Sequence, residues 1–172
     1  RMISDGALGD VVCVDLQAYQ SAFADRAAPV TWRQDVSLSG VNMLSVGIWY
    51  ETLLRWLGPA RRLWASAAVT VPVRKNAEGL DCVVEVPDHV SVIGEWARGG
   101  QFNLRFSAVT GMAPRNGVWI YGTEATLWVE TGPLRLRLAR RGDTEYQDVP
   151  LPDPGDGWRV EEEFVAAVRG LA

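Results

Sequence analysis

The sequence predicts an α+β domain built on one large, predominantly antiparallel open sheet with helices on one of its faces. Three observations lead to this prediction. Short segments of alternating polar and apolar residues follow one another from about residue 60 to residue 140, with tight turns between them. Only two segments, near residue 50 and near the C-terminus, have the spacing of an amphipathic helix. The length of 172 residues fits a single domain.

The N-terminal part of the chain is predicted to contain one strand and one helix. The strand follows a Gly-Asp turn, with Val12, Val14 and Leu16 on one face and Val11, Cys13 and Asp15 on the other. Residues 20–38 show weak periodicity and are expected to form an irregular connection. The helix after them has apolar residues at the i, i+3, i+4, i+7 positions, namely Val46, Trp49, Tyr50, Leu53 and Leu57. We expect Asn42 to cap its N-terminus, and Gly58 with Pro59 to end it.

From residue 61 onward the period changes from 3.6 to 2, which predicts a series of strands. The expected strands are 61–73, 82–86, 89–99, 101–109, 117–122, 125–132 and 133–142, with a polar loop at 74–79. Within 101–109, Phe102, Leu104 and Phe106 face one way and Asn103, Arg105 and Ser107 the other. Strands in succession with tight turns indicate an antiparallel meander. A proline-rich link at 149–157 leads to a last helix over 158–170, whose acidic first turn suits the helix dipole.

The face of the sheet that the helices leave open interleaves Arg, Asn, Gln and Ser with Trp and Tyr. A wide, mixed face of this kind is either solvated or paired with another subunit. The eight tryptophans of the chain favour a subunit contact. We therefore predict a homo-oligomer, a dimer in solution, that forms through the open face of the sheet.

Composition and charge exclude several classes of function. The net charge of −4 and the absence of a basic run do not favour nucleic-acid binding. No apolar stretch reaches the ~18 residues of a transmembrane helix, and no signal peptide is recognised. Cys13 and Cys82 lie in apolar runs and are interpreted as small hydrophobic residues, and a disulfide between them is possible but not required. Because His89 is the only histidine, no metal site is predicted. We expect a cytoplasmic protein without membrane or nucleic-acid partners.

The motifs of nucleotide-binding and hydrolytic enzymes are missing. The sequence has no G-x-G-x-x-G after a strand, no P-loop and no G-x-S-x-G. The segment VTWRQDVSLSG is the main candidate for binding chemistry, since Trp32, Arg33 and Asp35 precede its glycine turn. Arg33 could hold a carboxylate or phosphate through two hydrogen bonds, and Trp32 could stack on a sugar or ring. The alternative is a surface Arg–Asp pair beside a packed tryptophan.

Four segments, taken in order, resemble the C-terminal domain of the Gfo/Idh/MocA oxidoreductases, which include glucose–fructose oxidoreductase and inositol dehydrogenase. They are DGALGDVV, TWRQD…SG…L…GI…LLRWLG, VWIYGTEATLWV…LRLRL and EEEFVAAVRG, and the resemblance covers residues 4–170. It implies an N-terminal Rossmann domain, absent from this chain, that binds NAD or NADP. It also implies an oligomer interface on the open sheet face and hydride transfer to or from a sugar, polyol or similar small molecule. Residues 1–172 then form a single substrate-binding and oligomerisation domain, a piece of a longer protein.

The resemblance also identifies where this chain departs from the family. In many members an Asp and, four residues later, a His on the helix line the catalytic pocket. The match here runs through Gly40, Leu44 and Gly47, while Val41 and Asn42 stand at glycine positions; Ser45 occupies the Asp position and Trp49 the His position. Neither of these two transfers protons at neutral pH, so the catalytic residues remain unknown. The expected substrate-binding residues are Arg33, Asn42, Trp49 and Tyr50.

Three readings of the function follow. In the first, the chain is the substrate-binding and oligomerisation domain of an NAD(P)-dependent oxidoreductase, inactive alone. Catalysis would then use a lysine of the family's Glu-Lys-Pro motif in the missing domain, or another group such as Tyr50. In the second, a non-catalytic relative acts as a ligand sensor or interaction scaffold. In the third, the chain is a free-standing binding module unrelated to dehydrogenases.

Overall fold

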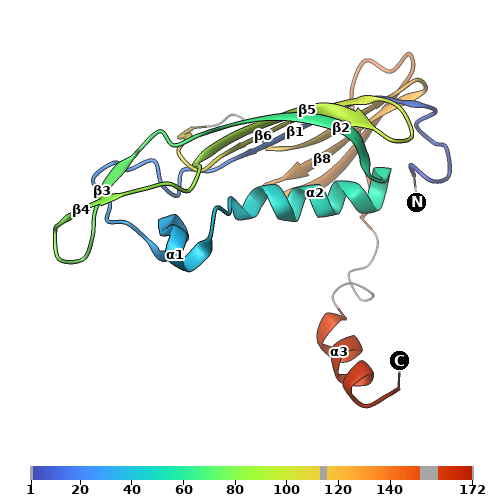
Figure 1. Cartoon of the computed structure of the whole chain (residues 1–172). Coiled ribbons are helices and arrows are strands. Elements are labelled where there is room, and N and C mark those ends of the chain that lie inside the picture. The colour runs from blue at the N-terminus through green and yellow to red at the C-terminus, as the bar shows by residue number, and fades with distance from the viewer. Residues whose placement is uncertain (1, 113–115, 152–158, 172) are drawn as a thin grey trace.

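The computed structural model describes residues 2–112, 116–151 and 159–171, and these form a broad mixed sheet backed by one long helix (Figure 1). In spatial order the eight strands that these residues give the sheet are β10 (Gln147–Val149), β9 (Leu134–Arg140), β8 (Ala125–Thr131), β7 (Gly117–Gly122), β1 (Val11–Tyr19), β6 (Gln101–Ser107), β5 (His89–Trp96) and β2 (Ala60–Ala68). A separate hairpin consists of β3 (Val73–Lys75) and β4 (Asp81–Val83). The helical segments are η1 (Trp32–Gln34), α1 (Val36–Ser39), α2 (Leu44–Leu57) and α3 (Val160–Val168).

The predicted fold class is confirmed, but the sheet is not a simple meander. The hairpins β5–β6, β7–β8 and β8–β9 are antiparallel, as the alternating segments and short turns predict. The first strand, β1, lies between β6 and β7, and it pairs parallel with β6 and antiparallel with β7. Sequence periodicity reports which residues share a face, not which strands are neighbours, so this insertion was not predicted.

The core lies between α2 and one face of the sheet. The predicted alternation on β6 is confirmed, because Phe102, Leu104 and Phe106 are at most 2% exposed and point to the covered face. β1 contributes Val14 and Leu16, both fully buried. Other strands add further buried side chains to the same cluster, namely Val90, Val92, Trp96, Val118, Ile120, Ala125, Leu127 and Leu138.

Helix α2 packs on this core with the face that its periodicity predicts. Leu53 and Leu57 are 0% and 5% exposed, and Trp49 and Tyr50 pack against the cluster while remaining partly exposed. Burying a leucine side chain fully contributes about 1.5–3 kcal/mol, so two such residues hold the helix firmly. The helix ends as predicted at Gly58, which has a φ of +85° and donates its N–H to the carbonyl of Leu54.

The predicted start of α2 is wrong by one residue. Met43 occupies the N-cap position, and it makes no side-chain capping hydrogen bond. Asn42 precedes it, exposed to solvent, and its backbone N–H donates to the carbonyl of Gly40 at 3.0 Å. The tight turn at Gly40 therefore takes the asparagine out of the capping position.

Other local predictions also need correction. The segment expected to be a polar loop begins inside a strand, because Arg74 and Lys75 belong to β3. The short strand β10 was not predicted, and most of the predicted link 149–157 lies outside the described residues. His89 is the half-buried first residue of β5, where the expected strand begins, and its ring centroid is 6.4 Å from that of Tyr19.

The C-terminal helix α3 forms where the sequence predicts a helix, but it stands apart from the sheet (Figure 1). Of the described helices, α2 therefore covers the sheet face. None of the described helices has the length and apolar character required to cross a membrane.

Candidate functional site

The segment that carries Trp32 and Arg33 forms a compact unit just before α2. Asp35 caps α1, since its carboxylate accepts hydrogen bonds from the Ser37 backbone N–H at 2.8 Å and hydroxyl at 2.6 Å. The hydrogen bond from the hydroxyl, and to a lesser extent the one from the N–H, lowers the pKa of Asp35 below its ordinary value. The hydroxyl of Ser39 donates to the Arg33 carbonyl at 3.1 Å. These bonds tie the end of α1 back to η1 and fix the path of the chain into the glycine turn.

The side chains of Trp32 and Arg33 are both exposed at this unit. The guanidinium carbon of Arg33 lies 4.4 Å from the centroid of the Trp32 ring, which is cation–π geometry. The alternative interpretation required an ion pair between Arg33 and Asp35. In the structure Asp35 instead accepts hydrogen bonds from Ser37, and Arg33 lies over the Trp32 ring. Trp32 is 58% exposed and so is not packed. The pair presents a cation and an aromatic ring to solvent.

Ser45 and Trp49 lie one turn apart near the start of α2, and both are half-buried. Trp49 packs against the core but remains partly exposed, so only part of its side chain is open to a ligand. Tyr50 also packs against the core, and its hydroxyl oxygen accepts a hydrogen bond from the Ala60 N–H at 3.3 Å. The hydroxyl of Tyr50 is thus directed toward the start of β2.

Two residues that support this site were not found from the sequence. Arg74 is 2% exposed, and its guanidinium donates to the backbone carbonyls of Phe23, Asp25 and Ala28, the second at 2.6 Å. Gln34 is 4% exposed and accepts a hydrogen bond from the Thr31 N–H at 3.1 Å. Arg74 holds the connection 20–30 and Gln34 closes η1. The only local signal was the Thr31–Gln34 spacing of a capping box.

A second candidate surface is the open face of the sheet. The strand registers align one residue from each strand in a single row across it. From β10 to β2 the row consists of Asp148, Arg137, Trp128, Trp119, Asp15, Asn103, Ile93 and Trp64.

The two ends of this row differ in exposure. At the β10 end, Trp128 is 2% exposed, because the Trp119 ring stacks on it at 5.6 Å and the guanidinium of Arg137 lies 4.9 Å from its centroid. At the β2 end, Ile93 and Trp64 are 52% and 58% exposed. One end of the open face is therefore covered by its own side chains and the other presents apolar surface to solvent.

Polar groups surround the exposed end. The amide of Asn103 donates to the carboxylate of Asp15 at 3.0 Å, and Arg62 and Glu95 form an ion pair at 2.6 Å. The hydrogen bond from Arg62 lowers the pKa of Glu95, and the same bond raises the pKa of Arg62. An apolar centre with a charged rim is the composition of a protein–protein interface.

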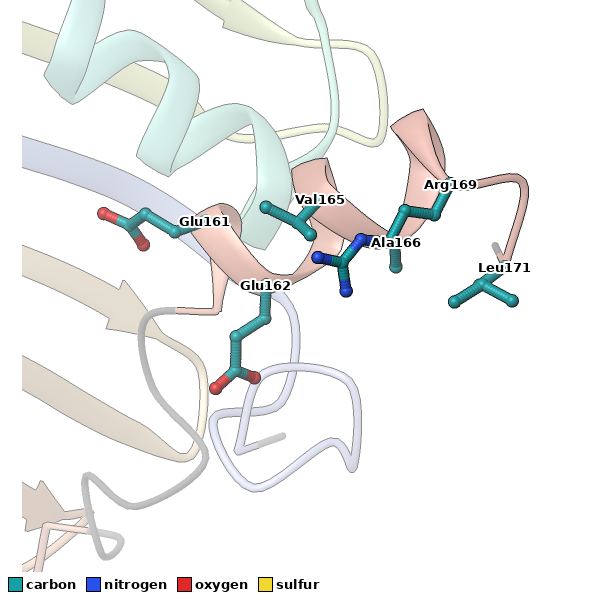
Figure 2. Close-up of a pocket in the computed structure, with 6 residues that line it drawn as sticks. All are labelled: Glu161, Glu162, Val165, Ala166, Arg169 and Leu171. Atoms are coloured by element: carbon teal, nitrogen blue, oxygen red, sulfur yellow. The ribbon is translucent and has the colours of Figure 1, made fainter.

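Two hollows in the described surface lie away from Trp32, Arg33 and α2, one at residues 142–147 and one at the C-terminal helix. One hollow has a volume of about 410 Å³, and the residues that line it come from α3 and the residues after it, namely Glu161, Glu162, Val165, Ala166, Arg169 and Leu171 (Figure 2). A surface of one helix without a second wall does not enclose a ligand. Among the described residues, no cluster of His, Cys, Asp and Glu could hold a metal ion.

Comparison with known proteins gives a family match. The sequence model of the GFO/IDH/MocA C-terminal domain matches residues 1–128. Among curated proteins there is no match.

Solved structures share the fold at low sequence identity. Levoglucosan dehydrogenase in its apo form aligns with a TM-score of 0.80 and 20% identity, over 98% of this chain and 53% of that chain. An NAD binding oxidoreductase from Klebsiella pneumoniae gives 0.70 and 22%, over 86% and 41%. An inositol dehydrogenase homolog from Azotobacter vinelandii, solved with NAD⁺, gives 0.67 and 21%, over 86% and 38%. The chain thus spans about half or less of the length of these proteins.

Proposed function

Because the chain belongs to the GFO/IDH/MocA family as its C-terminal domain, we propose that it is the substrate-binding and oligomerisation domain of an NAD(P)-dependent oxidoreductase. The substrate is a sugar, a polyol or a similar small molecule. The main support for this proposal is the family match over residues 1–128. The exposed pair of Trp32 and Arg33 adds to it, because this pair precedes α2, the helix that carries the family's catalytic positions.

The cofactor, NAD or NADP, is assigned to an N-terminal Rossmann domain and not to this chain. The described residues do not fit a dinucleotide. A Rossmann site needs a strand that runs through a glycine-rich turn into a helix N-terminus. Here α2 follows the four-residue helix α1, and its start at Met43 has no strand leading into it. Titration of the isolated chain with NADH, followed by fluorescence, should show no saturable binding.

The substrate residues are proposed with distinct roles. Arg33 supplies a guanidinium that can hold two oxygens of a ligand, and Asn42 supplies an exposed amide at the approach to α2. Trp49 supplies an apolar wall against the face of a sugar ring. Tyr50 contributes its ring edge, since its hydroxyl is already bonded to Ala60. Arg33, Asn42 and Trp49 do not transfer protons at neutral pH, so the proton transfer is assigned to the family's lysine in the N-terminal domain, with the Tyr50 hydroxyl as the alternative.

Steady-state kinetics of the intact protein with NAD and NADP, across a panel of sugars and polyols, tests the proposal. Arg33→Ala should raise KM about tenfold to a hundredfold with little change in kcat, because a charge-assisted hydrogen bond to the ligand is lost. Arg98→Ala is the matched control, since Arg98 is an exposed arginine near Gly58 at the other end of α2. The absence of turnover on every substrate would contradict the proposal.

The second candidate is a non-catalytic relative that acts as a ligand sensor or interaction scaffold. Ser45 and Trp49, in place of the family's Asp and His, favour it. The sequence of the N-terminal domain separates the two functions. A Glu-Lys-Pro lysine together with G-x-G-x-x-G supports the enzyme, and the loss of both supports the sensor.

The oligomerisation role is proposed for the exposed end of the open face. Ile93→Glu places a charge at its apolar centre and should shift a dimer toward monomer, as measured by light scattering over a concentration series. Leu80→Glu is the control, because Leu80 is 64% exposed in the β3–β4 turn, away from the large sheet. A wild-type chain that stays monomeric at high concentration would contradict this part of the proposal.

A further inference from the structure

Arg74 is a buried arginine whose guanidinium binds backbone groups of one segment. It is 2% exposed, and it donates to the carbonyls of Phe23, Asp25 and Ala28, far earlier in the chain. Among the described residues no carboxylate forms an ion pair with Arg74, so its charge has neutral partners. A buried charge often gives no more stability than an apolar side chain of similar volume. Its role is therefore sought in the segment that it binds.

The connection 20–30 has few other means of holding its position. None of its side chains is buried, and none belongs to the core cluster. Its first residues are bonded to the end of β6 and the residue after it. In the described chain, residues 25–30 are bonded to other elements only through β3, by the Arg74 side chain and by the Val30 N–H, which donates to the Lys75 carbonyl at 2.8 Å. The path of this stretch therefore depends on β3, and largely on one side chain.

The exposed pair Trp32 and Arg33 comes next in the chain. Among residues 31–42 only Gln34 is buried, and its side chain accepts a hydrogen bond from within the same turn. The pair therefore has no core contact of its own, and its place is set by α2 on one side and by the connection on the other. Figure 1 shows the connection running beside the hairpin β3–β4 before it reaches α1.

The hairpin that carries Arg74 is itself fixed to the large sheet. Asp88, 4% exposed and directly before β5, accepts hydrogen bonds from the Thr70 N–H at 2.9 Å, the Thr70 hydroxyl at 2.9 Å and the Val71 N–H at 3.2 Å. The Asp88 carbonyl accepts a further bond from the Ala108 N–H at 2.8 Å. The turn before β3 is thus tied to the ends of β5 and β6, and Arg74 binds the connection from a fixed frame.

We propose that Arg74 is a positioning residue of the substrate site, whose bonds to the connection 20–30 set the place of Trp32 and Arg33 relative to α2. The inference rests on the proposed function, because it takes Arg33 as a ligand of the substrate. Arg74 itself is buried and does not touch the substrate. Loss of its bonds leaves the Trp32–Arg33 contact intact but lets the pair move. Substrate binding then weakens, while the chemical step, assigned to other groups, does not change.

Steady-state kinetics of the intact protein tests this role. Arg74→Met keeps a similar side-chain volume and removes the donors, so KM should rise about fivefold to tenfold while kcat changes less than about twofold. Arg74→Lys keeps a charged donor without the planar fork, and its KM should lie between those of wild type and Arg74→Met. Leu138→Ala controls for lost stability, because Leu138 is buried in β9, and the cavity should leave KM unchanged.

A double-mutant cycle shows whether Arg74 acts through Arg33. In the Arg33→Ala background, Arg74→Met should raise KM by less than about a further twofold, because the group that it positions is gone. If Arg74→Met raises KM by the same factor in both backgrounds, Arg74 acts elsewhere and the proposal is overturned. An unchanged KM in Arg74→Met, or a loss of kcat as large as the rise in KM, also overturns it.

Limited proteolysis with trypsin provides a readout that needs no substrate. Arg26 is exposed, and Arg74 binds the carbonyls of Asp25 and Ala28 on either side of it. In native Arg74→Met protein, cleavage after Arg26 should be about tenfold faster than in wild type, because local opening becomes easier. Cleavage after Arg141, exposed in the turn that follows β9, is the internal control and should not change. Mass spectrometry identifies the fragments, and an unchanged rate at Arg26 overturns the proposal.

The same experiments separate this inference from the proposed function. If no sugar or polyol is turned over, or if Arg33→Ala keeps the wild-type KM, the proposed substrate site is rejected and the inference falls with it, whatever the rate of cleavage after Arg26. If Arg33→Ala raises KM and Arg74→Met does not, only the inference is rejected. Support requires a raised KM in Arg74→Met, its loss in the Arg33→Ala background, and faster cleavage after Arg26.

Discussion

Helices α2 and α3 show the same kind of apolar periodicity but have opposite surroundings. In α2, Leu53 and Leu57 are 0% and 5% exposed against the sheet. In α3, Phe164 and Val168 are 68% and 72% exposed, and the helix stands apart from the sheet (Figure 1). Periodicity therefore predicts that a helix has an apolar face but not that the same domain covers it. The difference decides which residues carry stability.

The largest expected difference between the two helices concerns truncation of their apolar side chains. Leu53→Ala should lower the free energy of unfolding by about 3 kcal/mol, because it removes buried methyl groups and leaves a cavity. Phe164→Ala should change it by less than about 0.5 kcal/mol, because the ring is already in water. Urea denaturation followed by tryptophan fluorescence measures both. If the two variants lowered the free energy of unfolding equally, α3 would have to be packed against another surface in solution. The contrast between the two helices would then be wrong.

A smaller effect on stability is expected for the hydrogen bond that joins Tyr50 of α2 to the backbone of β2. Tyr50→Phe removes the acceptor for the Ala60 N–H and should lower the free energy of unfolding by about 1 kcal/mol. The matched control is Tyr146→Phe, which removes a hydroxyl from a 39% exposed side chain while keeping its ring. Thermal and urea denaturation measure the two variants. If the two variants are equally stable, the hydrogen bond from the Ala60 N–H to Tyr50 does not contribute to holding α2 on the sheet.

Local patterns predicted the parts of the structure that depend on neighbours in sequence. The alternation of Phe102, Leu104 and Phe106 identified the covered face of β6, and Gly58 followed by Pro59 identified the end of α2. The position of β1 between β6 and β7 depends on pairings about 90 residues apart in sequence, which no local pattern reports.

The candidate site was predicted only in outline, for a similar reason. The sequence identified Trp32 and Arg33 as separate candidates for ligand binding but not the cation–π contact between them. It placed Arg74 in a polar loop, although its guanidinium is buried against the carbonyls of a segment some 50 residues earlier in the chain. A polar residue type predicts exposure, and only the distant backbone acceptors explain why this arginine is inside.

The smallest predicted difference concerns the exposed ion pairs of the two helices. Glu51 and Arg55 pair at 2.6 Å along α2, and Arg159 and Glu162 pair at 3.4 Å at the start of α3. Glu51→Gln should lower the free energy of unfolding by about 0.3–0.5 kcal/mol, and the loss should shrink in 1 M salt, where such pairs are screened.

Glu162→Gln removes a pair of the same kind from the helix that stands apart. Because none of the described residues of α3 is buried or packs against the core cluster, this change should leave the global unfolding midpoint unchanged and reduce only the helical signal of the native chain. Urea titrations at low and high salt, read by both fluorescence and circular dichroism, separate the two responses. A shift of the global midpoint by Glu162→Gln as large as that by Glu51→Gln would show that the two helices unfold as one unit.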